Sequence, residues 1–136
     1  MRTSTNRLVA VILGAACLIA GVAGFFVTTG VAFFSTSGRL LVGLFAVNPF
    51  ANVVDVLLAA ALLTAGLSSV AAAKVVTTIV GTVFLVLGIA GLFVIGGAFN
   101  ILAVNGADNV LHFASAVVLL AVGLGAERSV KTMVTS

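Results

Sequence analysis

Four long apolar runs, separated by short polar breaks, set the pattern of the chain. Each run is long enough to form one helix of about 20 residues across a bilayer. The runs cover approximately Leu8–Thr28, Pro49–Ser69, Val75–Gly97 and Gly106–Gly125. Together with their connections they use up the 136 residues. We therefore predict an all-α fold, an integral membrane four-helix bundle that forms a single transmembrane domain over residues 1–136.

Residues 46–67 and 103–124 are two versions of one segment, with 10 of the 22 aligned positions identical. Apolar matches arise easily in a chain this rich in Ala, Val and Leu, but polar matches do not. The chain has only six asparagines, and four of them fall into matched pairs. The pairs are Asn48 with Asn105 and Asn52 with Asn109.

The odd-numbered apolar runs also repeat, because residues 21–27 match residues 88–94 at five of seven positions. The offset between copies is 67 residues in the odd runs and 57 in the even runs, so the first connection is ten residues longer than the second. Each half is then an out-and-back hairpin of the same orientation. We predict two tandem hairpins, about residues 8–69 and 75–125, related as parallel repeats by an axis along the membrane normal.

Polar residues mark the start of each even-numbered helix. Asn48, followed by Pro49, is typical of an N-cap, because Asn accepts from free backbone N–H groups and Pro needs no partner at the first helical position. Asn105 is the second cap, and Asp108 three residues later can complete a capping box. We therefore expect helix caps at all three of these polar residues.

Asp55 and His112 occupy matching positions in the two copies and are the only ionisable residues well inside the predicted spans. Such residues usually face the bundle interior and pair with one another. We predict an Asp55–His112 hydrogen bond, with Asn52 and Asn109 completing an intramembrane cluster. The cluster has two interpretations, an interhelical polar clamp, which we favour from the sequence, or a proton relay or ion site.

Small residues recur at helical spacing in the odd-numbered spans. Close backbone approach at such residues drives helix association in membranes, so we predict an internal packing seam rather than a dimer face. The seam consists of Gly14, Gly21, Gly24, Gly81, Gly88 and Gly91. Cys17, the only cysteine, is interpreted as a small packing residue that has no disulfide partner.

The first connection is too apolar to stand in water. We expect its segment 39–45 to lie at the membrane interface as a short amphipathic or irregular piece. The chain has no Trp or Tyr, so the aromatic belt that usually marks the interface is absent. A protein neighbour at this edge is therefore favoured.

Composition and charge set the location. With 62% hydrophobic and 7% charged residues and a mean hydropathy of +1.42, the chain has too much apolar surface for a soluble domain. Five basic residues lie on one side of the predicted bundle, around the termini and a turn at 70–74, and one lies on the other. They are Arg2, Arg7, Lys74, Arg128 and Lys131, against Arg39. This bias predicts a multi-pass protein of the cell inner (plasma) membrane with both termini in the cytoplasm. The net charge then indicates contact with membrane lipids, not with nucleic acid.

No phosphate-binding loop, cysteine pair or haem motif occurs, and one His with one Asp cannot build a metal site. We therefore expect no cofactor and no metal, and we do not expect an enzyme. The predicted function is that of a non-catalytic accessory subunit that stabilises a larger inner-membrane complex, such as a transporter or respiratory assembly. The alternatives are a proton or small-ion pathway through Asp55 and His112, or a lipid-binding membrane protein.

Three spacings carry a resemblance: G-x-A-G-x-F-V, N-P-x-x-N-x-x-[D/H] and N-x-x-D-N-x-L-H. The third, from Asn105 to His112, is the most specific. From about Gly21 to Gly123 the chain resembles a family of small four-helix actinobacterial membrane proteins whose function is not assigned. It departs from that family at Ala51 and Asp55, where histidines are expected. The resemblance implies a membrane location and no activity.

Overall fold

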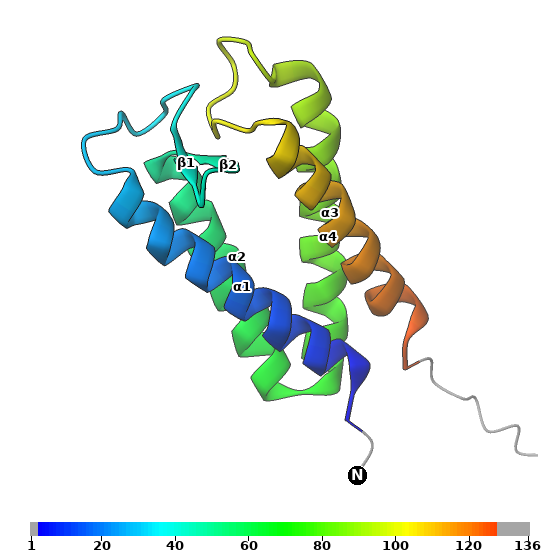
Figure 1. The fold of residues 1–136 in the computed structure, drawn as a ribbon. Coiled ribbons are helices and arrows are strands. Elements are labelled where there is room, and N and C mark those ends of the chain that lie inside the picture. Colours follow the sequence, from blue (N-terminus) through cyan, green and yellow to red (C-terminus); the bar gives the residue numbers. More distant parts are fainter. Residues whose placement is uncertain (1–2, 128–136) are drawn as a thin grey trace, which may run out of the picture.

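The computed structural model describes residues 3–127, which form four helices and one small antiparallel sheet (Figure 1). The helices are α1 (Thr5–Val27), α2 (Pro49–Ser68), α3 (Val70–Val94) and α4 (Gly106–Gly125), and the strands are β1 (Arg39–Leu41) and β2 (Phe45–Val47). All four helices are long and apolar enough to cross a membrane. The predicted helical membrane bundle is confirmed at this level.

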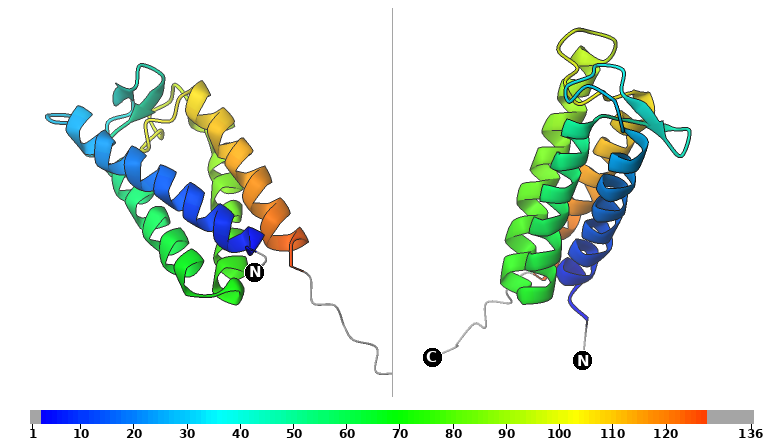
Figure 2. Two further views of the ribbon diagram at one scale, coloured as in Figure 1. Left: turned by 60° about the horizontal axis from the view of Figure 1, so that its bottom comes forward. Right: turned by 90° about the vertical axis from the view of Figure 1, so that its left-hand side faces the viewer.

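The helices pack as two pairs, α1 with α2 and α3 with α4, and the contacts between the pairs are fewer. One end of the bundle, which we call the turn end, holds the start of α1, the α2–α3 junction and the end of α4. The opposite end, the loop end, holds the connections 28–48 and 95–105 (Figure 2). The two pairs meet at the turn end and diverge toward the loop end (Figure 1).

A single residue, Ser69, joins α2 to α3. Its hydroxyl accepts a hydrogen bond from the backbone N–H of Ala72, which is the standard N-cap arrangement. Helix α3 therefore begins at Val70, and the turn expected at 70–74 is instead the first turn of the helix. The charge of Lys74 suggested a turn, but the serine cap ahead of it starts the helix.

Basic side chains close two helix ends at the turn end. Arg7 Nε donates to the carbonyl of Gly66 at 2.8 Å, and Lys74 Nζ donates to the carbonyl of Ala126 at 2.8 Å. Cations near a helix C-terminus satisfy free carbonyls and offset the helix dipole. Arg7 and Lys74 are themselves 67 residues apart, the offset of the odd-numbered copies. Three of the basic residues from which the membrane orientation was predicted lie outside the described residues, namely Arg2, Arg128 and Lys131.

A polar contact also joins the two helix pairs at the turn end. The fully buried Asn6 donates from Nδ2 to Glu127 Oε2 at 2.8 Å and accepts from Thr77 Oγ1 at 2.9 Å. Hydrogen bonds from Ser4 and Asn6 lower the pKa of the exposed Glu127 carboxyl below its ordinary value. The contact ties the start of α1 to α3 and to the end of α4.

The six seam glycines all lie against the partner helix of their own pair. A Cβ added to Gly14 would lie 3.0 Å from Leu62 Cβ, and one added to Gly81 would lie 2.9 Å from Leu119 Cβ. These two contacts involve matching positions of the two copies. The seam therefore lies inside each pair, and the buried core continues from it. Cys17 is a free thiol packed against that core.

The segment 39–45 is not an amphipathic or irregular piece, as the sequence suggested. It belongs to a β-hairpin in which Arg39 pairs with Val47 and Leu41 with Phe45. Three residues, 42–44, connect the strands, and Leu44 N donates to Leu41 O at 3.1 Å. The central residues of this tight turn, Val42 and Gly43, both have positive φ, 48° and 72°. The strands escaped prediction because this stretch is apolar on both faces and shows no alternation.

Candidate functional site

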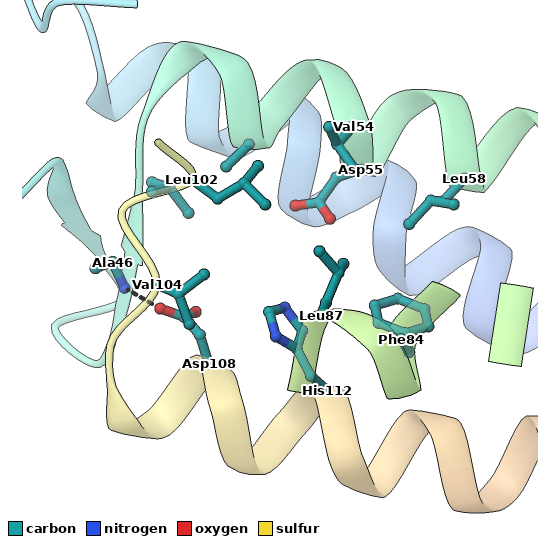
Figure 3. A pocket seen from close by; sticks show the side chains of 12 residues that line it. Ala46, Val54, Asp55, Leu58, Phe84, Leu87, Leu102, Val104, Asp108 and His112 are labelled. Atoms are coloured by element: carbon teal, nitrogen blue, oxygen red, sulfur yellow. Dashed lines mark hydrogen bonds between the residues drawn. The ribbon is translucent and has the colours of Figure 1, made fainter. Parts of the chain in front are cut away.

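A cavity of about 50 Å³ lies between the two helix pairs at the loop end (Figure 3). We call it the polar cavity. Its walls come from α2, α3, α4, β2 and the second connection, with the residues Ala46, Val47, Ala51, Val54, Asp55, Leu58, Phe84, Leu87, Leu102, Val104, Asp108 and His112. This volume is the space open to the centre of a water-sized sphere, and a polar space needs about 10–15 Å³ of it to hold one water molecule. The cavity therefore has room for more than one water.

Asp55 enters the polar cavity from α2 and His112 from α4, and Figure 3 shows their side chains facing each other across it. The predicted direct hydrogen bond between them is wrong. Among the described residues no hydrogen bond joins the two side chains, and the buried His112 Nδ1 has no hydrogen-bond partner. The helix pairs diverge at this end, so matched positions face one another across a gap instead of touching. The structure thus brings the acid and the base to one cavity without joining them.

The expected participation of Asn52 and Asn109 in this cluster is also wrong. Each lies inside its own helix pair, where a Cβ added to Gly24 or to Gly91 would collide with the asparagine amide. Asn52 Nδ2 donates to Thr28 Oγ1 at 3.0 Å. Three residues along a helix correspond to a rotation of about 300°, so each asparagine points about 60° away from the ionisable residue that follows it. The asparagines pack the helix pairs, and the ionisable residues line the space between them.

The predicted caps are present, and two of them also join the connections. Asn48 Oδ1 caps α2, while its Nδ2 donates to Ile101 O at 2.7 Å. Asn105 caps α4, while its Nδ2 donates to Leu44 O at 2.8 Å. Leu44 and Ile101 are 57 residues apart, so each cap binds the matching carbonyl of the other half. These reciprocal bonds hold the two connections over the cavity.

Asp108 completes the capping box of α4 and also lines the polar cavity. Its Oδ2 accepts from Asn105 N at 2.9 Å and from Ala46 N in β2 at 3.0 Å. Sequence reasoning assigned it only the cap. The missed signal was its spacing of four residues from His112, which places both side chains on one face of α4.

The chemistry of the site follows from these three ionisable side chains. Asp55 makes no hydrogen bond among the described residues, and no Lys or Arg lines the cavity. Within residues 3–127, no group of three His, Cys, Asp or Glu side chains could hold a metal ion. Toward the turn end, the bundle is filled by buried side chains such as Leu62 and Leu119. The arrangement suits proton exchange between a carboxylate and an imidazole through water.

One family model matches the chain. The model described as Domain of unknown function (DUF4383) covers residues 7–125, so the chain belongs to that family. The comparison with curated proteins and the comparison with solved structures both gave no match.

Proposed function

We propose that this member of the DUF4383 family binds and releases protons at the Asp55–His112 pair, inside the membrane and from the loop-end side. The polar cavity is the observation that carries the proposal. A structural clamp needs a direct bond, and here an acid and a base face each other across a space large enough for water. A buried nitrogen without a protein partner, such as His112 Nδ1, is normally satisfied by water.

The filled core at the turn end argues for a site with access from one side, not for an open pathway through the bundle. Ionisable side chains inside a membrane are costly and mark proton or ion sites. The two carboxylates and the imidazole therefore form the most specific chemical feature of the chain. We assign proton binding to Asp55 and His112, and a positioning role to Asp108, whose Oδ2 is held by two backbone N–H groups.

His112 is the only histidine, so a single NMR signal reports on the site. The full-length protein in lipid nanodiscs is titrated from about pH 5 to pH 8, where imidazoles change charge. We expect the His112 ring nitrogens to titrate and the midpoint to move in Asp55→Asn. Glu127→Gln, at the opposite end, is the control and keeps the wild-type midpoint. A flat titration, or a midpoint that ignores Asp55→Asn, overturns the proposal.

We further propose that the chain is a tandem duplication of one hairpin in a plasma membrane, with the turn end in the cytoplasm. The reciprocal bonds from Asn48 and Asn105 support the duplication. The orientation is favoured by the basic residues at the turn end. In a Cys17→Ala background, a cysteine at Val42 is expected to react with an impermeant maleimide from outside, and one at Ala71 is not. The opposite labelling contradicts this orientation.

A second candidate function, compatible with the first, is that of a non-catalytic accessory subunit of a larger membrane complex. The observation favouring it is the exposure of large apolar side chains on the loop end, such as Val42 at 80% and Phe99 at 86%. Exposed apolar patches of this kind mark contact surfaces. Membrane lipids are the partners expected along the sides of the helices.

Gentle extraction with a C-terminal tag tests the accessory function. We expect a membrane complex to co-purify with the wild-type protein and not with the double variant Val42→Asn/Phe99→Ser. Leu57→Ala, at a position 64% exposed in the middle of α2, is the matched control and retains the complex. Recovery of only the free protein from the wild type eliminates this candidate.

A further inference from the structure

We propose that the polar cavity and an apolar cavity beside it form one binding site for an amphiphilic ammonium cation. The ammonium group would bind at Asp55 and the alkyl part would fill the apolar cavity. The inference rests on the proposed function only in that both need the Asp55 carboxylate. It adds a class of ligand that proton binding does not require.

The apolar cavity, of about 130 Å³, lies between the loop-end half of α3 and the second connection. Ala90, Val94 and Phe99 contribute to its walls, and Leu87, Leu102 and Val104 line both cavities. The two spaces are therefore neighbours that share these three side chains in their walls.

The one polar side chain in the wall of the apolar cavity is already satisfied. Asn100 Nδ2 donates to Val104 O and Asn100 Oδ1 accepts from Val104 N, both at 2.9 Å. A ligand in the apolar cavity therefore needs no polar group to pair with the Asn100 side chain. It suits an alkyl group, which gains by leaving water and needs no hydrogen bond.

The charge of the polar cavity selects a cation. Asp55 faces Asp108 and His112 on α4, Cys17 is its titratable neighbour on α1, and the lining residues of α3 and β2 are apolar. Within residues 3–127, no Lys or Arg lines either cavity. Apart from the His112 imidazole, which is cationic only when protonated, Asp55 therefore has no cationic side chain as a partner at this site, and a ligand can supply one.

An ammonium fits this site better than a metal ion or a neutral lipid does. Ca²⁺ and Mg²⁺ demand six or more oxygen ligands or retained waters and Zn²⁺ takes at least three protein ligands, but residues 3–127 offer no group of three His, Cys, Asp or Glu side chains that could hold a metal ion. An ammonium is a compact charge with several N–H donors, so the Asp55 carboxylate and its neighbours suffice. A neutral lipid would add no counter-charge for the Asp55 carboxylate beyond the His112 imidazole.

Octylammonium is the probe, and its binding to the full-length protein in phosphatidylcholine nanodiscs is measured by calorimetry against empty nanodiscs. 1-Octanol is the probe without charge and methylammonium is the probe without chain. We expect octylammonium to bind about tenfold or more tighter than either control, because only octylammonium combines a charge that attracts the Asp55 carboxylate with an alkyl chain that gains by leaving water. Equal binding of octylammonium and octanol overturns the proposal, and so does equal binding of octylammonium and methylammonium.

Variants assign the two halves of the site. Asp55→Asn is expected to lose the preference for octylammonium, and Asp55→Glu to keep it within a few-fold. Ala90→Leu narrows the apolar cavity and weakens octylammonium binding about tenfold, while Ala23→Leu, at the matching position of the first copy, leaves it unchanged. Wild-type affinity in both Asp55→Asn and Ala90→Leu overturns the site. If Asp55→Asn does not fold, Ala90→Leu against Ala23→Leu decides.

The two proposals fail separately. The His112 titration is recorded without ammonium, so proton binding can hold while octylammonium fails to bind. Conversely, octylammonium binding that depends on Asp55 can hold while His112 does not titrate.

Discussion

Replacing Asn48 by aspartate tests whether side-chain amides hold the loop end together. Asn48 is fully buried. Its Oδ1 accepts from Ala51 N at 2.8 Å, and its Nδ2 donates to Ser35 O at 2.8 Å and to Ile101 O at 2.7 Å. Aspartate has the same shape and is an equally good N-cap. It keeps the cap but turns an oxygen, not an NH₂ group, toward two carbonyl oxygens.

The magnitude separates a simple cap from a cross-link. If Asn48 only capped α2, Asn48→Asp would be nearly silent, and Asn48→Ala would cost about 1 kcal/mol. Leaving a buried polar group unsatisfied costs about 1–3 kcal/mol, although hydrogen bonds within membranes average only about 0.6 kcal/mol. Two lost bonds therefore lower the free energy of unfolding by about 1–6 kcal/mol in Asn48→Asp, as much as in Asn48→Ala or more.

The assay is reversible unfolding of the full-length protein in mixed SDS–dodecylmaltoside micelles, followed by circular dichroism. The loss in Asn48→Asp should shrink at acid pH, because a protonated carboxyl can donate to one of the two carbonyls. An Asn48→Asp variant within about 0.5 kcal/mol of the wild type, beside a destabilised Asn48→Ala, refutes the cross-link.

Three further predictions concern the packing and the turn end, and the same unfolding assay tests them. Gly24→Ala and Gly91→Ala each place a methyl group against an asparagine amide and should lower the free energy of unfolding by about 1–3 kcal/mol. Gly106→Ala, which has open space at its Cβ, is the control and should not destabilise the protein. Equal losses of stability in all three variants would contradict the steric explanation. Arg7→Met removes the donors to the end of α2 and should cost about 0.5–1 kcal/mol, and an unchanged stability would show that these bonds contribute nothing. Hydrogen bonds lower the pKa of Glu127 in the folded state. The contribution of Glu127 to the free energy of unfolding is therefore present above the ordinary glutamate pKa and is lost as pH falls through the lowered value. Glu127→Gln should reduce this loss of stability at acid pH, and a variant with the wild-type pH profile would contradict the assignment.

The parts of the fold that depend on local chemistry could be predicted from the sequence. Helix length follows from the apolar runs, and the starts of α2 and α4 follow from Asn48 and Asn105, whose caps need no tertiary information. The start of α3 was harder to predict, because Ser69 favours a helix that begins at residue 70 and the charged Lys74 favours one that begins after it. Only the three-dimensional structure distinguishes the two. The β-hairpin was missed because a stretch that is apolar on both faces lacks the alternation of polar and apolar residues that indicates a strand.

The candidate site shows the same division. The repeat placed Asp55 and His112 at one level and on facing sides, and the structure brings both to the polar cavity. Whether they touch depends on how far the helix pairs diverge at the loop end. That divergence is a property of tertiary packing, and no local sequence motif reports it. The asparagines were misassigned for a simpler reason, since a step of three residues is only approximately one face of a helix.

The inferred duplication explains how a chain this small acquired an acid facing a base. In a symmetric dimer of single hairpins, a residue beside the two-fold axis would face its own copy, so the cavity would hold two aspartates or two histidines. Duplication frees the two positions to differ while the reciprocal cap bonds keep the frame symmetric. The contacts that build the frame, at the glycines and the caps, are matched in both halves, whereas the residues that face the cavity, Asp55 and His112, are not. Retention of the frame contacts together with divergence of the pair that faces the cavity is what selection on a site is expected to leave behind after the proposed duplication.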